Sequence, residues 1–259
     1  MIRDVWEAGD AYEAYVGRWS RHVARVFVPG LGVPPGRRWL DVGCGTGALA
    51  STVLAEAAPV RVVGVDRSSG FLATARRRVA AAFCVGDARA LPLGDARFDA
   101  VISGLALNFV PDPDRAVAEF VRVAAPGAVV AAFVWDYAEG MTMMRHFWDV
   151  AGALDPVAAS LDEGSRFPVC RADGLRDLWL GAGLAGVVVD AIEVPTVFTG
   201  FDDYWQPFLG GQGAAPAYVA TLDDERRAVL REALRDRLGA QPDRAIPLTA
   251  RAWAVRGSA

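Results

Sequence analysis

Residues 40–47 read Leu40-Asp41-Val42-Gly43-Cys44-Gly45-Thr46-Gly47, an apolar run that ends in an acidic residue and is followed by three glycines at alternate positions. A helix-prone segment, residues 48–57, comes next. Glycine tolerates the backbone conformations of a tight strand-to-helix turn, and the helix that follows offers unpaired N–H groups. The pattern predicts a buried parallel strand that turns into a helix where the backbone approaches a ligand.

The glycine spacing separates two classes of cofactor. A dinucleotide fingerprint reads G-x-G-x-x-G, whereas here the pattern is G-x-G-x-G and position 48 is Ala. The carboxylate of Asp41 in this turn would repel a pyrophosphate, but it suits a ligand with an ammonium and a sulfonium. The interpretation favours S-adenosylmethionine over a nicotinamide dinucleotide. A third interpretation is a turn that is glycine-rich only for close packing.

Acidic residues also follow the next two predicted strands. Val62-Val63-Gly64-Val65 ends at Asp66, a position from which a carboxylate can accept hydrogen bonds from both ribose hydroxyls. In Cys84-Val85-Gly86-Asp87-Ala88, Asp87 can accept from an adenine amino group while Ala88 leaves the adenine plane accessible. Taken alone, Asp87 is equally well an ordinary turn residue at a strand end. Three such turns at neighbouring strand ends favour a nucleoside site over packing.

A fourth segment extends this edge. The strand predicted from Phe98 ends at Ser103-Gly104, where the backbone can approach a ligand, and Leu105 to Phe109 would form part of the ligand wall. Asp112 and Pro113 then predict a helix start, because Asp caps helices and Pro suits the first helical position.

Strand and helix patterns alternate along the chain, which is typical of a parallel sheet covered by helices on both faces. The predicted strands are 38–43, 60–65, 82–86, 98–103, 127–135, 187–194 and 246–255, and the last could close the sheet as an antiparallel edge. The predicted helical segments are 4–28, 46–57, 69–80, 112–124, 137–170, 171–182 and 201–238.

Composition excludes several classes of function. The chain has 259 residues, 53% of them hydrophobic, which predicts one elaborated α/β domain with a substantial core. A formal net charge of -4 argues against a nucleic-acid surface. The cysteines form no CxxC pair, so neither a zinc or other metal site nor a disulfide framework is expected. Without a signal-peptide core or a membrane-length apolar run, we expect a cytoplasmic location and no membrane partner.

From about Trp39 to Trp135 the sequence resembles the class I S-adenosylmethionine-dependent methyltransferases, in particular a bacterial small-molecule branch with a Leu-Ala-Leu segment and an Asp-Pro turn after the fourth strand. The opening residues 12–21 are similar to leader helices of that group. The resemblance implies a doubly wound, Rossmann-like sheet of seven strands with an antiparallel last strand, plus a helical cap. It describes 1–259 as a single domain, with an N-terminal helical cap at 1–35, a cofactor-binding core at 36–136, and substrate-side helices and final strands at 137–259.

The resemblance and the motifs together give a candidate cofactor site. Asp41 and the glycines would frame the methionine moiety, Asp66 would hold the ribose, and Asp87 with Ala88 would flank the adenine. The full set of expected cofactor-binding residues is Tyr15, Arg18, Asp41, Gly43, Cys44, Gly45, Gly47, Asp66, Arg67, Asp87, Ala88, Ser103 and Leu105.

Two departures from the family pattern bear on the substrate. Many relatives carry His or Trp after the Leu-Ala-Leu run, where this chain has Asn108 and Phe109. The Asn/Asp-Pro-Pro-Tyr run of enzymes that methylate amino groups in DNA and some proteins is absent, so those substrates are disfavoured.

The sequence therefore predicts an enzyme that transfers a methyl group by in-line displacement to a small, partly apolar metabolite. The chain holds two histidines, His22 and His146; the candidate catalytic base is His146, with Asp136 and Tyr137 as comparable candidates. Tyr12, Tyr15 and Trp19 could belong to a leader helix that closes over the site. Two alternatives stay open: a protein that binds the cofactor as a sensor or assembly partner without transferring methyl groups, and an NAD-dependent oxidoreductase. A homodimer is a further expectation.

Overall fold

The computed structural model describes residues 17–259 apart from 211, 212 and 243. The chain divides into two compact units. The first, called the core unit, comprises Ser20–Val134, Val169–Ile192 and Ala252–Ala259. Of the described residues, the second unit, called the helix-rich unit, comprises 17–19, Trp135–Pro168 and Glu193–Arg251. The predicted leader residues Tyr12 and Tyr15 lie outside the described residues.

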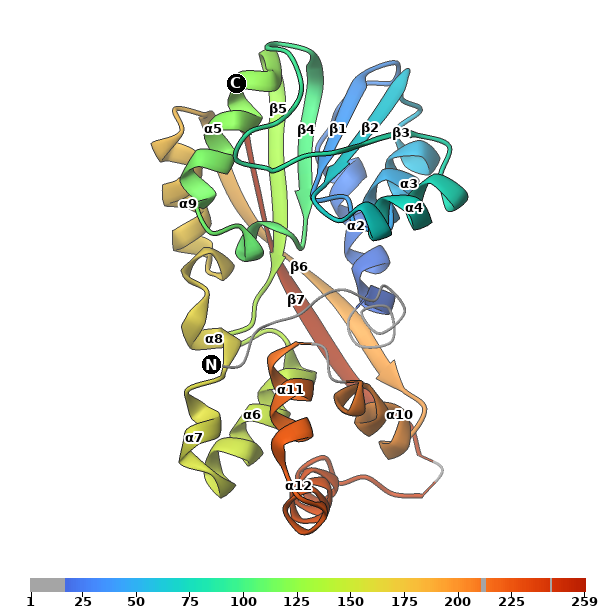
Figure 1. Cartoon of the computed structure of the whole chain (residues 1–259), viewed down its shortest axis with the longest axis vertical. Helices are drawn as coiled ribbons and strands as arrows, with labels where there is room; N and C mark the ends of the chain where they lie inside the picture. The colour runs from blue at the N-terminus through green and yellow to red at the C-terminus, as the bar shows by residue number, and fades with distance from the viewer. Residues whose placement is uncertain (1–16, 211–212, 243) are drawn as a thin grey trace. The chain divides into compact units, whose positions relative to one another are not determined.

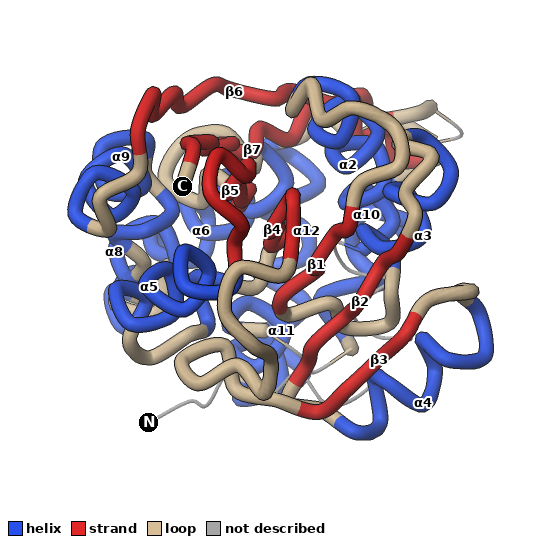
Figure 2. The backbone as a smooth tube through the Cα atoms, turned by 90° about the horizontal axis from the view of Figure 1, so that it is seen from above, coloured by secondary structure: helices blue, strands red, loops and turns tan. Residues whose placement is uncertain are grey.

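One sheet of seven strands runs through the described chain in the order β3-β2-β1-β4-β5-β7-β6 (Figures 1 and 2). Its strands are β1 (Arg38–Val42), β2 (Arg61–Asp66), β3 (Ala82–Val85), β4 (Phe98–Gly104), β5 (Ala124–Trp135), β6 (Ala185–Phe198) and β7 (Ile246–Ser258). The strand prediction is confirmed, although β6 is longer than the predicted 187–194 because its polar residues alternate with buried apolar ones.

The first five strands are parallel. Leu40 of β1 pairs with Val63 of β2 on one side and Val101 of β4 on the other, and all three side chains are buried. Strands that are covered on both faces must be apolar throughout, which explains the continuous apolar runs in this half of the sequence. Because the strands are parallel, their carboxyl ends share one edge of the sheet.

The last strand is antiparallel, as the resemblance implied. Gly127 N–H donates to Ala259 O at 2.8 Å, and Ala259 N–H donates to Ala128 O at 3.0 Å. The prediction that this strand closes the sheet as an edge is wrong, because β7 lies between β5 and β6. The edge strand beyond β7 is β6, which exposes nearly every second residue along its length.

Helices cover both faces of the sheet in the core unit. Figure 2 shows α2, α3 and α4 on one side of β1–β4, and α5 and α9 on the other. Phe27 of α2 packs edge-on against Phe133 of β5 at 4.8 Å, and Trp179 of α9 donates its indole N–H to Val130 O at 2.9 Å. The helices are α2 (Arg18–Gly30), α3 (Ala48–Glu56), α4 (Ser69–Arg78), α5 (Pro113–Val123) and α9 (Ala172–Gly181), with a 3-10 turn, η2 (Leu107–Phe109).

The helix-rich unit has an aromatic core. Phe147 of α6 stacks on Phe208 with ring centroids 4.5 Å apart, and Tyr204 donates its hydroxyl to Met143 O at 2.9 Å. Met143 and Met144 are buried in this core, so they fill gaps rather than line an open surface. The elements are α6 (Thr142–Leu154), α7 (Pro156–Ala159), α8 (Glu163–Arg166), η3 (Pro168–Cys170), α10 (Phe201–Trp205), η4 (Gln206–Leu209), α11 (Ala214–Thr221) and α12 (Asp224–Arg237).

The described helices are all too short or too polar to cross a lipid bilayer.

Candidate functional site

The sheet brings the predicted site residues of the core unit to one edge. Asp41 is the penultimate residue of β1, and Asp66 is the last residue of β2. Asp66 pairs with Val85, the last residue of β3, and Asp87 follows two residues later. Since the neighbouring strands are parallel, these three carboxylates and Ser103 of β4 lie at the same carboxyl edge, where open α/β sheets bind ligands.

Asp41 is the most unusual residue of this edge. Its side chain is buried, with 1% of the residue exposed, and neither carboxylate oxygen has a hydrogen-bond partner. Burial raises the pKa of Asp41 to about 7; the backbone N–H of Ala50 opposes the rise, and the charge of Asp66 adds to it. The N–H of Ala50 is near enough to lower this pKa, but it does not make a hydrogen bond to either carboxylate oxygen. A buried carboxylate without a partner is costly, and a cation is the ligand that would relieve the cost.

The three glycines of the turn serve different needs. All have positive φ, at 74° for Gly43, 52° for Gly45 and 88° for Gly47. A Cβ on Gly43 would lie 2.4 Å from the Cβ of Ala106, and one on Gly47 would lie 2.9 Å from Cγ2 of Val79. A Cβ on Gly45 would meet nothing within 4 Å. Packing alone therefore requires two of the glycines, while the open space beside Gly45 leaves room for a ligand.

Asp66 ties the turn to the end of β2. Its carboxylate accepts from Gly45 N–H at 2.9 Å and from Ser68 N–H at 2.8 Å. A carboxylate has about four acceptor positions, so Asp66 can still accept from ribose hydroxyls. Cys44 is buried with its sulfur against Gly64, and burial raises the pKa of its thiol, so this thiol is not a nucleophile at neutral pH.

Asp87 is exposed, and its carboxylate is hydrogen-bonded to a residue of the same loop. Arg89 donates its backbone N–H to Asp87 at 2.9 Å, and its guanidinium makes a bidentate pair with the same carboxylate at 3.0 and 2.7 Å. These bonds, with the nearby charge of Arg67, lower the pKa of Asp87 well below its usual range. The carboxylate is ionised and remains able to accept further hydrogen bonds, as an adenine contact requires. Ala88 beside it is partly exposed.

The segment after β4, where the sequence predicts a ligand wall from Leu105 to Phe109, contains a buried polar residue to which the sequence assigned no role. Ser103 is buried, with its hydroxyl oxygen 4.0 Å from the position of a Cβ on Gly43, and Leu105 adopts the left-handed conformation with φ 57°. Such strain in a non-glycine residue is concentrated at functional sites. On η2, Asn108 is 8% exposed and its amide nitrogen has no partner. Two signals in the sequence indicated Asn108: its place in the predicted wall segment, and its departure from the family pattern.

The remaining predicted site residues belong to the helix-rich unit. The Arg18 guanidinium lies 4.5 Å from the Trp19 ring and 4.7 Å from the Phe198 ring, and it pairs with Asp203 at 2.8 Å. His146 is half-buried, and its Nδ1 accepts from Arg237 at 3.4 Å. Burial and the Arg237 charge lower the pKa of His146, so its imidazole is neutral at pH 7.

Asp136 has a structural role instead. It is buried and pairs with Arg251 of β7, whose Nε lies 2.7 Å from Oδ2, while Oδ1 accepts from Glu139 N–H at 3.1 Å. Tyr137 is also buried, with its ring 6.0 Å from that of Phe167. Neither side chain is exposed at a surface where it could act as a base.

The residues of the core unit fit an adenosyl cofactor that carries positive charge. The fit is shown by the unpartnered carboxylate of Asp41, the open space at Gly45 and the acceptors that remain on Asp66. Both oxygens of Asp41 are shielded from solvent.

Comparison with known proteins finds a family model that matches part of the core unit. Residues 40–132 match the model of a family described as a methyltransferase domain. The match, with the strand order and the antiparallel last strand, supports the predicted resemblance to class I S-adenosylmethionine-dependent methyltransferases over these residues.

Individual proteins match the chain over part or most of its length. A demethylmenaquinone methyltransferase of Renibacterium salmoninarum is 44% identical over 109 residues, which is 42% of this chain and 45% of that protein, so the chain matches less than half of its relative's length. Phosphoethanolamine N-methyltransferase 2 of Haemonchus contortus, solved with S-adenosyl-L-methionine, has a TM-score of 0.57 at 17% identity over 95% of this chain and 56% of that one. The cyclase SpnF has a TM-score of 0.54 at 21% identity over 92% and 80%. These two structures share the fold.

The glycines can be separated by substitution. We expect Gly43→Ala to destabilise the protein by roughly 2–4 kcal/mol, because the new Cβ combines a left-handed backbone with a clash against Ala106. Gly45→Ala should cost only about 1–2 kcal/mol, since its Cβ enters open space. Urea denaturation measures both. Equal losses would show that the open space beside Gly45 does not exist.

The raised pKa of Asp41 predicts a pH-dependent stability. Between its ordinary value of 3.8 and about 7 the folded chain binds more protons than the unfolded chain, so this carboxyl lowers stability as pH rises through that window. Asp41→Asn should therefore stabilise the protein more at pH 8 than at pH 5, by roughly 2–3 kcal/mol. Denaturant titrations at both pH values measure the difference. The control is Asp190→Asn, an exposed carboxylate of β6, which should show no such difference. A pH-independent effect of Asp41→Asn would mean that Asp41 is ionised in the fold.

Proposed function

We propose that this chain is an S-adenosylmethionine-dependent methyltransferase that acts on a small, partly apolar metabolite. The observation that carries the proposal is the buried, unpartnered carboxylate of Asp41 at the carboxyl edge of a methyltransferase domain. The ammonium group of the methionine moiety would supply the missing partner. A pyrophosphate would not, which argues against an NAD-dependent oxidoreductase.

The proposed roles follow the order of the strands. The glycine turn and Asp41 of β1 receive the methionine moiety, and Asp66 at the end of β2 accepts from the ribose hydroxyls. Asp87 and Ala88 after β3 flank the adenine, with Arg67 nearby. Ser103 and Leu105 after β4 border the methionine end, and the Cys44 backbone lies inside the turn. Tyr15 and Arg18 complete the proposed set of cofactor-binding residues.

Methyl transfer needs positioning more than covalent help. The glycine turn, Asp41 and Asp66 would hold a cofactor that would supply a methyl group on a sulfonium, which the acceptor's lone pair would displace from sulfur as the carbon–sulfur pair returns to it. The chain contributes orientation and exclusion of water, and near-attack geometry can supply about 7–11 kcal/mol of the barrier reduction. The acceptor's proton passes to a base or to water, and His146, held neutral at pH 7, is the proposed base.

The acceptor class is inferred from the relatives and from one side chain. The similar protein of Renibacterium salmoninarum acts on demethylmenaquinone, an apolar small molecule, which supports an acceptor of that kind here. The unpartnered amide of Asn108 would meet an oxygen on such an acceptor, since a buried donor without a partner is costly. A homodimer in the cytoplasm is part of the proposal.

A second candidate is a protein that binds the cofactor without transferring methyl groups. The fold permits this candidate, because SpnF has the same fold and is named a cyclase, not a methyltransferase. The two candidates differ in turnover and not in cofactor binding.

Calorimetric titration and turnover separate the candidates. We expect S-adenosylmethionine and S-adenosylhomocysteine to bind with micromolar affinity, and NAD not to bind at millimolar concentration. A panel of quinols, phenols and carboxylic acids should then give S-adenosylhomocysteine with at least one acceptor, and Asp66→Ala should weaken cofactor binding about tenfold or more by removing its hydrogen bonds. Binding without turnover on any acceptor would favour the second candidate; no binding by the folded protein would refute both.

A further inference from the structure

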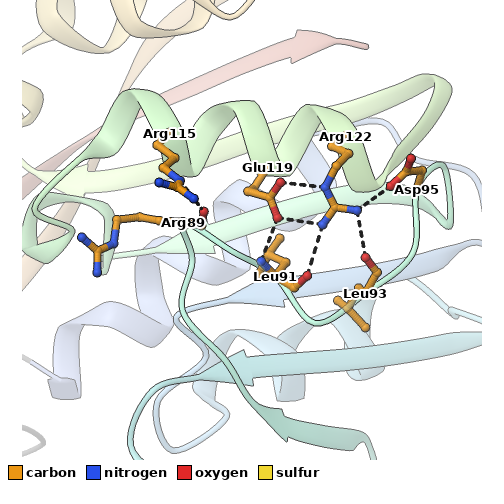
Figure 3. Close-up of polar contacts among 7 residues, drawn as sticks. All are labelled: Arg89, Leu91, Leu93, Asp95, Arg115, Glu119 and Arg122. Atoms are coloured by element: carbon orange, nitrogen blue, oxygen red, sulfur yellow. Dashed lines mark hydrogen bonds and ion pairs between the residues drawn. The ribbon is translucent and has the colours of Figure 1, made fainter.

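A row of side chains on α5 holds the loop between β3 and β4. Arg115, Glu119 and Arg122 are four and three residues apart, so they project from one face of the helix. Figure 3 shows this row directed at residues 89–95 of the loop. The loop begins just after β3 and carries Asp87 near its start, so it forms the proposed adenine side of the site.

The guanidinium of Arg122 uses all five of its N–H donors in this contact. Nε and Nη2 donate to the two oxygens of Glu119 at 2.6 and 2.7 Å. Nη2 also donates to Leu91 O at 3.1 Å, and Nη1 donates to Leu93 O at 2.9 Å and to Asp95 Oδ1 at 2.5 Å. One side chain therefore holds alternate residues of the loop.

The other two members of the row complete the contact. Glu119 Oε2 accepts from Leu91 N–H at 2.8 Å, so both backbone groups of Leu91 are bound by the pair. Arg115 Nε donates to Arg89 O at 3.0 Å. We call the three side chains Arg115, Glu119 and Arg122 the loop clamp.

The clamp is partly shielded from solvent. The side chain of Glu119 is 17% exposed and that of Arg122 is 32% exposed. The hydrogen bonds from Arg122 lower the pKa of Glu119, so the pair is ionised at neutral pH. Charge-assisted bidentate bonds of this kind fix geometry better than an exposed ion pair does.

The clamped residues are in turn attached to Asp87. The backbone and guanidinium of Arg89 bind the Asp87 carboxylate, and Ala90 N–H donates to Asp87 O at 3.0 Å. Pro92 packs against Gly86, where a Cβ would lie 2.7 Å from the Pro92 Cδ. The placement of residues 89–92 therefore sets the placement of Asp87 and Ala88.

We propose that Glu119 and Arg122 are positioning residues for the adenine end of the cofactor: they hold residues 89–95 so that Asp87 and Ala88 form a preset adenine wall. This inference rests on the proposed function. Preorganisation lowers the ordering cost of binding, so loss of the clamp should weaken cofactor binding and reduce discrimination at the adenine amino group.

The test compares two ligands that differ at that amino group and at the adjacent ring nitrogen N1, which carries a hydrogen in the second ligand. S-adenosylhomocysteine and S-inosylhomocysteine, in which oxygen replaces the 6-amino group, are titrated calorimetrically against the wild type, Arg122→Met and Arg122→Lys. The control is Arg77→Met, an exposed arginine of α4 in the same unit. Hydrogen exchange of the amides of residues 88–95, measured without ligand, reports on the clamp itself, and thermal unfolding confirms that each variant is folded.

We expect the wild type to prefer S-adenosylhomocysteine by at least about tenfold, the value of one good hydrogen bond. Arg122→Met should weaken S-adenosylhomocysteine binding about tenfold, bring the preference close to one, and speed exchange in residues 88–95 but not in β1. Arg122→Lys keeps the positive charge but lacks the planar set of guanidinium donors, so its affinity and its ligand preference should lie between those of the wild type and Arg122→Met. Arg77→Met should match the wild type in both.

Two results would overturn the inference. One is a folded Arg122→Met or Arg122→Lys variant that keeps the wild-type preference despite faster loop exchange, which would show that the clamp serves only the fold. The other is unchanged exchange in residues 88–95, which would show that the loop is held by other contacts. A wild type that binds neither ligand would instead refute the proposed function, and this inference with it.

Discussion

The buried carboxylate of Asp41 is the constraint on which the proposed site depends. It stands on β1, the middle one of the five parallel strands, is shielded from solvent and has no hydrogen-bond partner. A carboxyl in such a place stays neutral unless a cation enters beside it, and that accounts for the pKa of about 7. Burial of this carboxylate therefore costs free energy in the unliganded fold, and a cationic ligand beside it would reduce that cost.

The rest of the edge follows from the packing around this strand. Parallel neighbours bring the ends of β2, β3 and β4 beside β1, and the glycine turn packs so closely on Ala106 that Gly43 has no room for a side chain. Helix α5 then connects two parts of the edge. It begins at the Asp112 cap, just after the segment that contains Asn108. Farther along the helix, Glu119 accepts a hydrogen bond from Leu91 in the loop that follows Asp87.

Much of this was predictable from the sequence, because buried parallel strands are apolar throughout and their turns need glycine and acidic residues in a short spacing. The places of Asp41, Asp66 and Asp87 at one edge follow from strand order alone. The position of β7 inside the sheet did not follow, since an apolar pattern does not say which neighbours a strand has. The structural role of Asp136 was also missed, because its partner, Arg251, is distant in the chain. The unpartnered state of Asn108 depends on packing that no local pattern encodes.

The most direct test counts protons released when S-adenosylmethionine binds at pH 6, from calorimetric enthalpies in two buffers of different ionisation enthalpy. If Asp41 has a pKa of about 7 and ionises beside the ammonium, the wild type should release about 0.9 proton, and Asp41→Asn should release none. Binding by the wild type with no proton release, or the same release by both proteins, would contradict the account.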